Sequence, residues 1–247
     1  MRSLRYTVPL LAGVLVIALC GLVRAAADGS RQAASYKLTQ RHPHKGTAER
    51  FRFDYVNPDD AAAKPPAVRR VVTVLPGGAR YNTSVPGQCQ ASDAELMAAG
   101  ADACPPDSRI GGGVVTVDSG VPGPGRIVTA DVEFVNNAGQ FIYVNTVRGT
   151  AARTVIRAAV TRRMTITDAG MLPGTPPDGG AIDTVDLTVN KVSRRIDGRM
   201  RHYITTPRRC SRKTHFWRTQ VRFAYADGVE QTVGDTTPCK PKHRRGR

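Results

Sequence analysis

Aromatic residues, acidic residues and long apolar runs are scarce in this sequence. Aromatic side chains make up 6% of the 247 residues, and 20 Asp and Glu stand against 36 Lys and Arg, for a formal net charge of +16. Beyond residue 23 no apolar run is long enough to span a bilayer, which argues against several membrane-spanning helices. The 24 Gly and 17 Pro interrupt the chain too often for a helical bundle, and 40% hydrophobic residues are too many for a wholly disordered chain.

The first 27 residues have the three parts of an export signal. Two arginines lie within the first six residues, residues 7–23 are uncharged and mostly apolar, and Ala25 and Ala27 form an A-x-A cleavage motif. We expect cleavage between Ala27 and Asp28. Because the apolar run approaches the length that spans a bilayer, an uncleaved N-terminal membrane anchor is the alternative. In both cases the rest of the chain is expected to be secreted or to lie at the cell envelope, outside the cytoplasm.

Four cysteines follow this segment: Cys89, Cys104, Cys210 and Cys239. An even number of cysteines in an exported chain predicts two disulfides, for which three connectivities exist. Proximity along the chain favours Cys89 with Cys104 and Cys210 with Cys239, because short loops close at a lower entropic cost. The chain has no C-x-x-C pair, so the cysteines do not indicate a metal site, and we predict neither a metal nor a cofactor.

Apolar and polar residues alternate with a period of two along most of the remaining chain. The clearest runs are residues 51–55, 128–134, 185–189 and 217–225. This alternation predicts antiparallel strands with one face in a core and the other in solvent. Two runs, 71–75 and 141–144, are apolar on both faces and are expected at the centre of a sheet. We therefore predict an all-β, antiparallel β-sandwich, Ig-like or jelly-roll-like, over residues 50–239, after a lead-in and first strand in residues 28–49.

One short helix is predicted between Cys89 and Cys104. Ser92 followed three residues later by Glu95 is a capping box, and Gly100 is a residue type at which helices end. Because nine residues are too few for a stable isolated helix, the flanking cysteines are expected to clamp it against the sheet.

Catalytic motifs are weak, and we identify no catalytic residue. The glycines at 111–113 precede a strand rather than a helix, so a flexible loop is expected there instead of a phosphate-binding loop. Asp131 and Glu133 share a strand face, but it is the polar face, where pairing with an arginine is the ordinary role. His42 and His44 lie in a basic segment that opposes cation binding, and we expect them to be solvated.

Arginine doublets and a basic C-terminal segment dominate the charge. The doublets are Arg69-Arg70, Arg162-Arg163, Arg194-Arg195, Arg208-Arg209 and Arg244-Arg245. Residues 240–247 are expected to be a disordered basic tail, with these candidate contacts to a polyanion: Lys240, Lys242, Arg244, Arg245 and Arg247. The expected partner is an anionic cell-wall polymer or a membrane surface, because guanidinium groups pair with phosphates and carboxylates. A merely solvated surface is the alternative. No nucleic acid is expected in an exported protein, and the oligomeric state stays open.

Four segments carry a resemblance to a known family. They are FDYVNPDD at 53–60, VPGQC at 85–89 followed by ACP at 103–105, PGTPPDGG at 173–180, and YITTP at 203–207 followed by FAYADG at 223–228. Together they resemble a group of secreted, β-rich actinobacterial proteins of unknown function, over roughly residues 50–239. The resemblance implies export and the two local cysteine pairs, and it implies no catalytic residues.

The sequence thus predicts an exported, non-enzymatic β-sandwich protein that contacts anionic envelope polymers or lipid headgroups. A secreted hydrolase acting on cell-envelope polysaccharide, with catalytic residues that the sequence does not identify, is the alternative.

Overall fold

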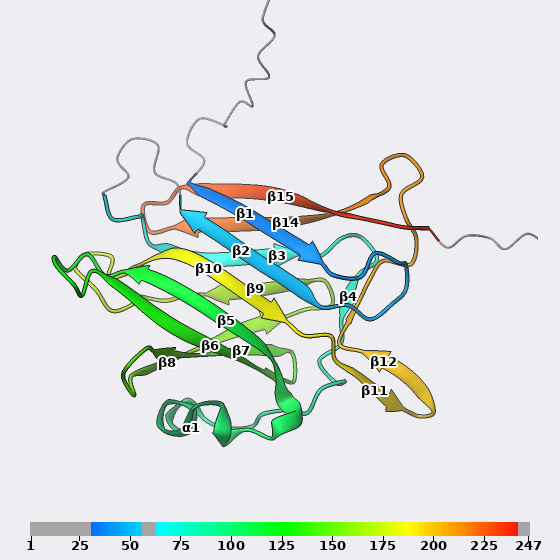
Figure 1. The fold of residues 1–247 in the computed structure, drawn as a ribbon, viewed down its shortest axis with the longest axis horizontal. Coiled ribbons are helices and arrows are strands. Elements are labelled where there is room, and N and C mark those ends of the chain that lie inside the picture. The colour runs from blue at the N-terminus through cyan, green and yellow to red at the C-terminus, as the bar shows by residue number, and fades with distance from the viewer. Residues whose placement is uncertain (1–30, 56–62, 242–247) are drawn as a thin grey trace, which may run out of the picture.

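The computed structural model describes residues 31–55 and 63–241 of the chain (Figure 1). The expected export segment 1–27 and its cleavage residues Ala25, Ala27 and Asp28 lie outside these residues. So do four of the candidate contacts in the basic tail: Lys242, Arg244, Arg245 and Arg247. Within the described residues, no helix is both long enough and apolar enough to cross a membrane.

Strands make up most of the fold. In chain order they are β1 (Gln32–Leu38), β2 (Glu49–Tyr55), β3 (Val68–Val74), β4 (Arg80–Tyr81), β5 (Arg109–Asp118), β6 (Ile127–Asn137), β7 (Gln140–Val147), β8 (Arg153–Val160), β9 (Met164–Asp168), β10 (Ala181–Val189), β11 (Ser193–Ile196), β12 (Arg199–His202), β13 (Ile204–Thr205), β14 (Phe216–Tyr225) and β15 (Glu230–Pro238). A short helix, α1 (Asp93–Ala99), and two 3₁₀ turns, Gly100–Ala103 and Pro106–Ser108, lie between β4 and β5. The predicted all-β fold with one short helix next to a disulfide is confirmed.

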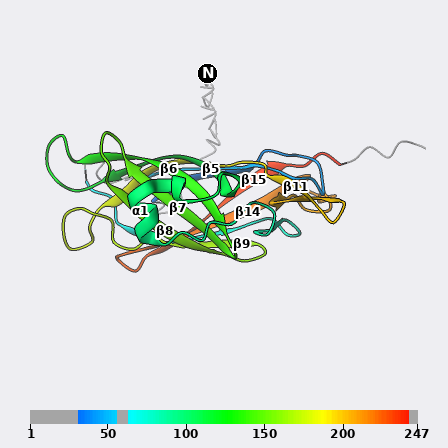
Figure 2. The same ribbon diagram turned by 90° about the horizontal axis from the view of Figure 1, so that it is seen from below.

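Eleven strands form one antiparallel sheet in the order β1-β2-β10-β5-β6-β7-β8-β9-β3-β14-β15. The sheet curls until β1 lies beside β15, as Figure 1 shows at the top of the view. Seen from below, the molecule is flattened (Figure 2). The two layers of the sandwich are therefore parts of one continuous, barrel-like sheet, and the core lies between them.

Side chains of β15, rather than a backbone ladder, hold the seam between β1 and β15. The backbone N–H of Tyr36 donates to Oδ2 of Asp235 at 2.7 Å, and the N–H of Leu38 donates to the hydroxyl of Thr237 at 3.0 Å. The side chain of Gln231 accepts from the backbone N–H of Gln32 at 3.2 Å and donates to its carbonyl at 3.1 Å. The exposed backbone of an edge strand invites pairing with other chains, and these contacts occupy that of β1.

Inward-facing side chains follow the period-two pattern of the sequence. The buried rings of Phe53 on β2 and Phe223 on β14 lie 5.3 Å apart in an edge-to-face contact across the core. Val185 on β10 and Val132 on β6 are buried in the same core cluster. The alternating runs are thus confirmed as β2, β6, β10 and β14.

The two runs that are apolar on both faces lie away from the seam. β3 pairs with β9 and β14, and β7 pairs with β6 and β8. Ile142 and Val144 of β7 pack on the outside of the sheet against Leu96 of α1, and all three are completely buried. Helix α1 therefore explains why β7 needs two apolar faces.

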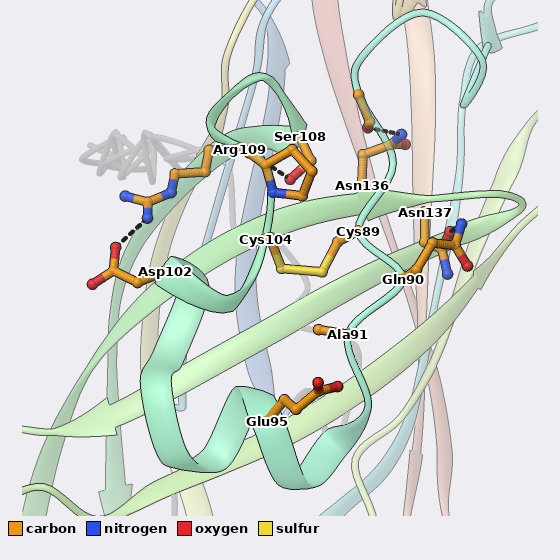
Figure 3. Close-up of a disulfide and its surroundings, with 12 residues drawn as sticks. Cys89, Gln90, Ala91, Glu95, Asp102, Cys104, Ser108, Arg109, Asn136 and Asn137 are labelled. Carbon is orange, nitrogen blue, oxygen red and sulfur yellow. Dashed lines mark hydrogen bonds and ion pairs between the residues drawn. A yellow bond between two sulfur atoms is a disulfide. The ribbon is translucent and has the colours of Figure 1, made fainter.

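The capping box fixes the start of α1. The hydroxyl of Ser92 accepts from the backbone N–H of Glu95, and the carboxylate of Glu95 accepts from the backbone N–H of Ser92 at 2.7 Å. The Cys89–Cys104 disulfide joins the segment that enters the helix to the turn that leaves it (Figure 3). The helix is therefore clamped at both ends, as the sequence predicts.

The second disulfide, Cys210–Cys239, joins the segment before β14 to the residue after β15. Close to it, the indole N–H of Trp217 donates to the carbonyl of Arg209 at 3.0 Å. Both cysteine pairs favoured by proximity along the chain are present.

The flexible loop expected at the glycine triplet is wrong. Residues 111–113 lie inside β5, paired with β10 on one side and β6 on the other. A Cβ on Gly113 would lie 2.0 Å from the carbonyl oxygen of Asp186, and one on Gly112 would lie 2.2 Å from that of Val132. Here glycine marks the close approach of neighbouring backbones rather than a loop.

Candidate functional site

Four of the five arginine doublets lie within the described residues, and the structure divides these four into two kinds. Three arginines from two doublets form ion pairs with carboxylates: Arg69 with Asp178 at 3.2 Å, Arg70 with Asp168 at 2.5 Å, and Arg194 with Asp107 at 3.6 Å. These are ordinary surface pairs, worth about 0–1 kcal/mol each. The doublets 162–163 and 208–209 instead meet at one hollow, which we call the arginine hollow.

The arginine hollow has a volume of about 500 Å³. Arg162 and Arg163 come from the turn between β8 and β9, Arg208 and Arg209 from the segment after β13, and Arg80 from β4. The rest of the lining is His44, Gly77, Gly78, Ala79, Thr205 and Thr206. Three segments that are well separated in the chain thus bring five arginines to one hollow.

Backbone contacts hold these segments together. The strand pair β4–β13 places Arg80 opposite Thr205. Three further hydrogen bonds fasten the walls: Leu75 N–H to the Arg163 carbonyl, Tyr81 N–H to the Arg162 carbonyl, and His44 N–H to the Pro207 carbonyl, each at 2.9 Å. The positions of the arginines therefore follow from the fold and not from contacts between their charged groups.

No carboxylate lines the arginine hollow, and none of its arginines forms an ion pair with any described residue. Arg163 donates to the carbonyl of Leu75 at 3.1 Å, and the four arginines of the two doublets are exposed. Like charges gathered at a concave surface create a positive potential that attracts anions. The pKa of neighbouring His202 is lowered by burial and by the positive charges of Lys191, Lys45 and His44.

The first residue of the basic tail starts beside this hollow. Lys240 is exposed, and its backbone N–H donates to the carbonyl of Arg41 at 2.8 Å. The disulfide between Cys210 and Cys239 joins the residue after Arg209 to the residue before Lys240. The fold thus places Lys240 close to the doublet Arg208-Arg209, and the sequence alone does not reveal that they are neighbours.

A second feature lies inside the sheet. A cavity of about 210 Å³ runs between the two layers, lined mostly by apolar side chains of β2, β3 and β5 to β10. Glu49 and Tyr36 line it at the end of the sheet near β4. The hydroxyl of Tyr81 donates to Oε2 of Glu49 at 2.9 Å, and the hydroxyl of Tyr36 donates to the same oxygen.

Burial controls the titration of this cluster. It raises the pKa of Glu49 to about 7, against the lowering effect of the two tyrosine hydroxyls. Burial, followed by the nearby charge of Glu49, raises the pKa of Tyr36 and Tyr81 well above 10. No sequence motif singles out Glu49. The available signal was its position two residues before Phe51 and four before Phe53, which places it on the inward face of β2.

The remaining sequence candidates lie on the surface. Asp131 points outward from β6 and pairs with Arg148 at 2.7 Å, and the hydrogen bond from Arg148 lowers the pKa of Asp131. Glu133 lies 3.9 Å from Arg109. The expected pairing of these carboxylates with arginines is confirmed. Among residues 31–55 and 63–241, no three or more His, Cys, Asp or Glu side chains are grouped so that they could hold a metal ion.

Comparisons with protein-family models, with curated proteins and with solved structures find no match for this chain.

Proposed function

We propose that this is an exported, non-enzymatic protein that binds an anionic polymer of the cell envelope through the arginine hollow. The observation that carries the proposal is a set of five arginines, without acidic partners among the described residues, around one concave surface. The two disulfides are compatible with an extracellular location, because such bonds persist in oxidising compartments. The hydrolase alternative stays a prediction.

Guanidinium chemistry supports an anionic ligand with repeated charges. Each guanidinium presents a planar fork of donors that matches the oxygens of a phosphate or carboxylate group. A polymer with a phosphodiester in each repeat can bring several anionic groups to the hollow at once. Lys240 adds a further positive charge close to the hollow, and the sequence that follows it is rich in Lys and Arg.

The ion pairs elsewhere on the surface strengthen the argument. Where Arg69, Arg70 and Arg126 lie on the body of the protein, an aspartate accompanies each of them. The hollow gathers more positive charge than any of these positions and has no carboxylate in its lining. An external anion is the group that would neutralise it.

The test is binding of the purified protein to wall teichoic acid, a phosphodiester polymer. We expect the combined substitution of Arg162, Arg163, Arg208 and Arg209 by Ala to weaken binding by about tenfold or more, since each charged contact contributes about 0.2–1 kcal/mol. The matched control is Arg194→Ala with Arg195→Ala, which removes a doublet outside the hollow and should change affinity by less than about threefold.

The salt dependence supplies a second readout. The Debye length falls from about 30 Å at 0.01 M salt to about 8 Å at 0.15 M, so binding should weaken steeply over this range. Equal loss of binding in the hollow variant and in the control doublet would contradict a localised site. Binding that does not change with salt would contradict the electrostatic mechanism.

A further inference from the structure

The interior of the sheet is not filled by side chains. In a β-sandwich whose interior is filled, side chains that point inward, as those of Phe53 and Val185 do, are buried. Here the inward-facing Val71, Val115 and Ile182 remain half-buried, because they border the cavity of about 210 Å³ rather than the opposite layer. Unfilled interior volume reduces stability in proportion to its size, so a cavity of this size calls for an occupant.

The lining indicates an apolar occupant. Most of it is formed by Val, Ile, Leu, Ala and Phe side chains. An engineered apolar cavity of about 150 Å³ stays dry and binds benzene. The present cavity is larger, and by the same scale it holds an apolar molecule of about eight carbon atoms.

One end of the cavity is closed and carries the buried carboxyl group of Glu49. The strand pair β4–β13 lies at this end and contributes the buried side chains of Tyr81 and Ile204; Figure 1 labels β4 right of centre. Both Tyr36 and Tyr81 donate to Oε2 of Glu49, and among the described residues no hydrogen bond reaches Oε1. A polar atom at the end of an apolar cavity is the arrangement that orients a ligand.

The other end of the cavity is bordered by the segment between β9 and β10. Leu172 and Pro173 of this segment line the cavity, and Pro173 is exposed. The ammonium group of Lys64 donates to the carbonyl of Gly179 at 2.7 Å, and a backbone bridge joins Leu172 to Gly180. This segment is therefore tied down at the end of the cavity opposite Glu49, where the lining reaches the surface.

We propose that the cavity binds a small aliphatic molecule with a single hydroxyl group, its chain along the apolar lining and its hydroxyl at Oε1 of Glu49. An uncharged hydroxyl can donate to the ionised carboxylate and accept from the protonated carboxyl group, so it suits both states of Glu49. A charged head would have to lose its hydration in an apolar cavity, which is costly even beside an opposite charge. The cavity and the arginine hollow have no lining residue in common.

The experiment is calorimetric titration of the purified protein with 1-octanol. We expect saturable binding of one molecule per chain. Val115→Phe adds a ring to the cavity lining and should weaken binding by about tenfold or more. Val114→Phe adds the same ring to the outer face of the same strand, opposite Asp131 and Asp186, and should leave the affinity unchanged.

Far-UV circular dichroism will show whether Val115→Phe folds. If it does not fold, two further measurements test the proposal. Ala130→Leu, at the residue paired with Val115 on the neighbouring strand, adds three carbon atoms to the same part of the lining and should likewise weaken binding. 1-Chlorooctane cannot donate a hydrogen bond, and it leaves water more readily than 1-octanol because it has no hydroxyl group to desolvate. The affinity for 1-octanol relative to that for 1-chlorooctane should therefore be higher in the wild type than in Glu49→Met, by about threefold or more.

Three results would overturn the inference. Absence of saturable octanol binding, or unchanged binding in folded Val115→Phe, would show that the cavity does not take an apolar ligand. A preference for octylammonium or octanoate over 1-octanol would show that the head group is charged. A ratio of 1-octanol to 1-chlorooctane affinity that is the same in the wild type and in Glu49→Met would remove the role of Glu49.

Discussion

Replacing Asp235 by Ala should open the seam that closes the sheet. The side chain of Asp235 accepts the backbone N–H of Tyr36 and pairs with Lys37. Tyr36 is only 2% exposed, so its N–H group cannot turn to water when the acceptor is lost. An unpaired buried N–H costs about 1–3 kcal/mol, and the half-exposed ion pair adds about 0–1 kcal/mol. We expect a loss of about 2–3 kcal/mol in the free energy of unfolding.

Urea unfolding at neutral pH, followed through the fluorescence of Trp217, measures this loss. Thr236→Ala is the matched control, because Thr236 is the exposed neighbour of Asp235 on the outer face, and it should change stability by less than about 0.5 kcal/mol. Hydrogen exchange at the Tyr36 amide should accelerate in Asp235→Ala. Equal stability of the two variants would refute the assignment of the seam to side-chain acceptors.

The pH dependence of the seam follows from the pKa of Asp235. Burial raises this pKa. Hydrogen bonds from Lys37 and from the N–H groups of Tyr36 and Thr236 lower it, and their combined effect is the larger, so the pKa of Asp235 lies below its ordinary value. A depressed pKa in the folded state gives stability that is present above the unfolded pKa, about 3.9, and is lost as pH falls through the folded pKa. The difference between wild type and Asp235→Ala should therefore shrink as the solution is acidified below about pH 4.

Three further predictions concern the two disulfides, the buried carboxyl group of Glu49 and the glycines of β5. Cys239→Ser should expose Trp217 at lower urea than Cys104→Ser does, because the lost bridge closes 29 rather than 15 residues and ends next to β15; equal midpoints would contradict this ranking. Wild-type stability should fall by about 3 kcal/mol between pH 4.5 and pH 7, because the raised pKa of Glu49, about 7, favours folding only while the group is protonated; in Glu49→Gln this fall should be absent. Gly113→Ala should destabilise by about 3 kcal/mol or more in thermal unfolding, whereas Gly77→Ala, whose Cβ would have no atom within 4 Å, should be nearly neutral.

Local patterns were sufficient to predict the strands, the helix and the disulfides. The period-two alternation at 51–55 and 217–225 depends only on which face of a strand meets the core. The order of apolar and polar residues within each short segment is enough to show that face. The capping box of Ser92 and Glu95 is likewise a local signal. Proximity along the chain identified Cys89 with Cys104 because the intervening helix turns the chain back on itself.

The order and closure of the strands could not be predicted from these patterns. β10 pairs between β2 and β5, and β3 pairs between β9 and β14, so both join strands far away in the sequence. The seam likewise depends on Asp235 and Thr237, ordinary polar residues whose role arises only when β1 arrives beside them. A glycine triplet gives the same sequence signal in a loop as in a crowded strand.

The candidate sites show the same limit. Arg162-Arg163 and Arg208-Arg209 were noted as charges, but nothing in the sequence distinguishes them from Arg69-Arg70, which the fold pairs with aspartates. Glu49 was accessible in principle, since it has the inward parity of Phe51. A charged residue at the start of a strand is usually solvated, and only the neighbouring tyrosines, brought from β1 and β4, make its burial tolerable.

The strand pair β4–β13 separates the two candidate sites, and this separation makes them independently testable. Arg80 of β4 lines the arginine hollow, while the next residue, Tyr81, holds Glu49 at the closed end of the cavity. Screening by salt weakens contacts between exposed charges, but it has little effect on apolar contacts inside the sheet. Raising the salt concentration should therefore release an anionic polymer from the hollow and leave octanol affinity unchanged. Octanol binding that weakens in parallel with polymer binding would mean that both ligands use one site, and that β4 does not divide them.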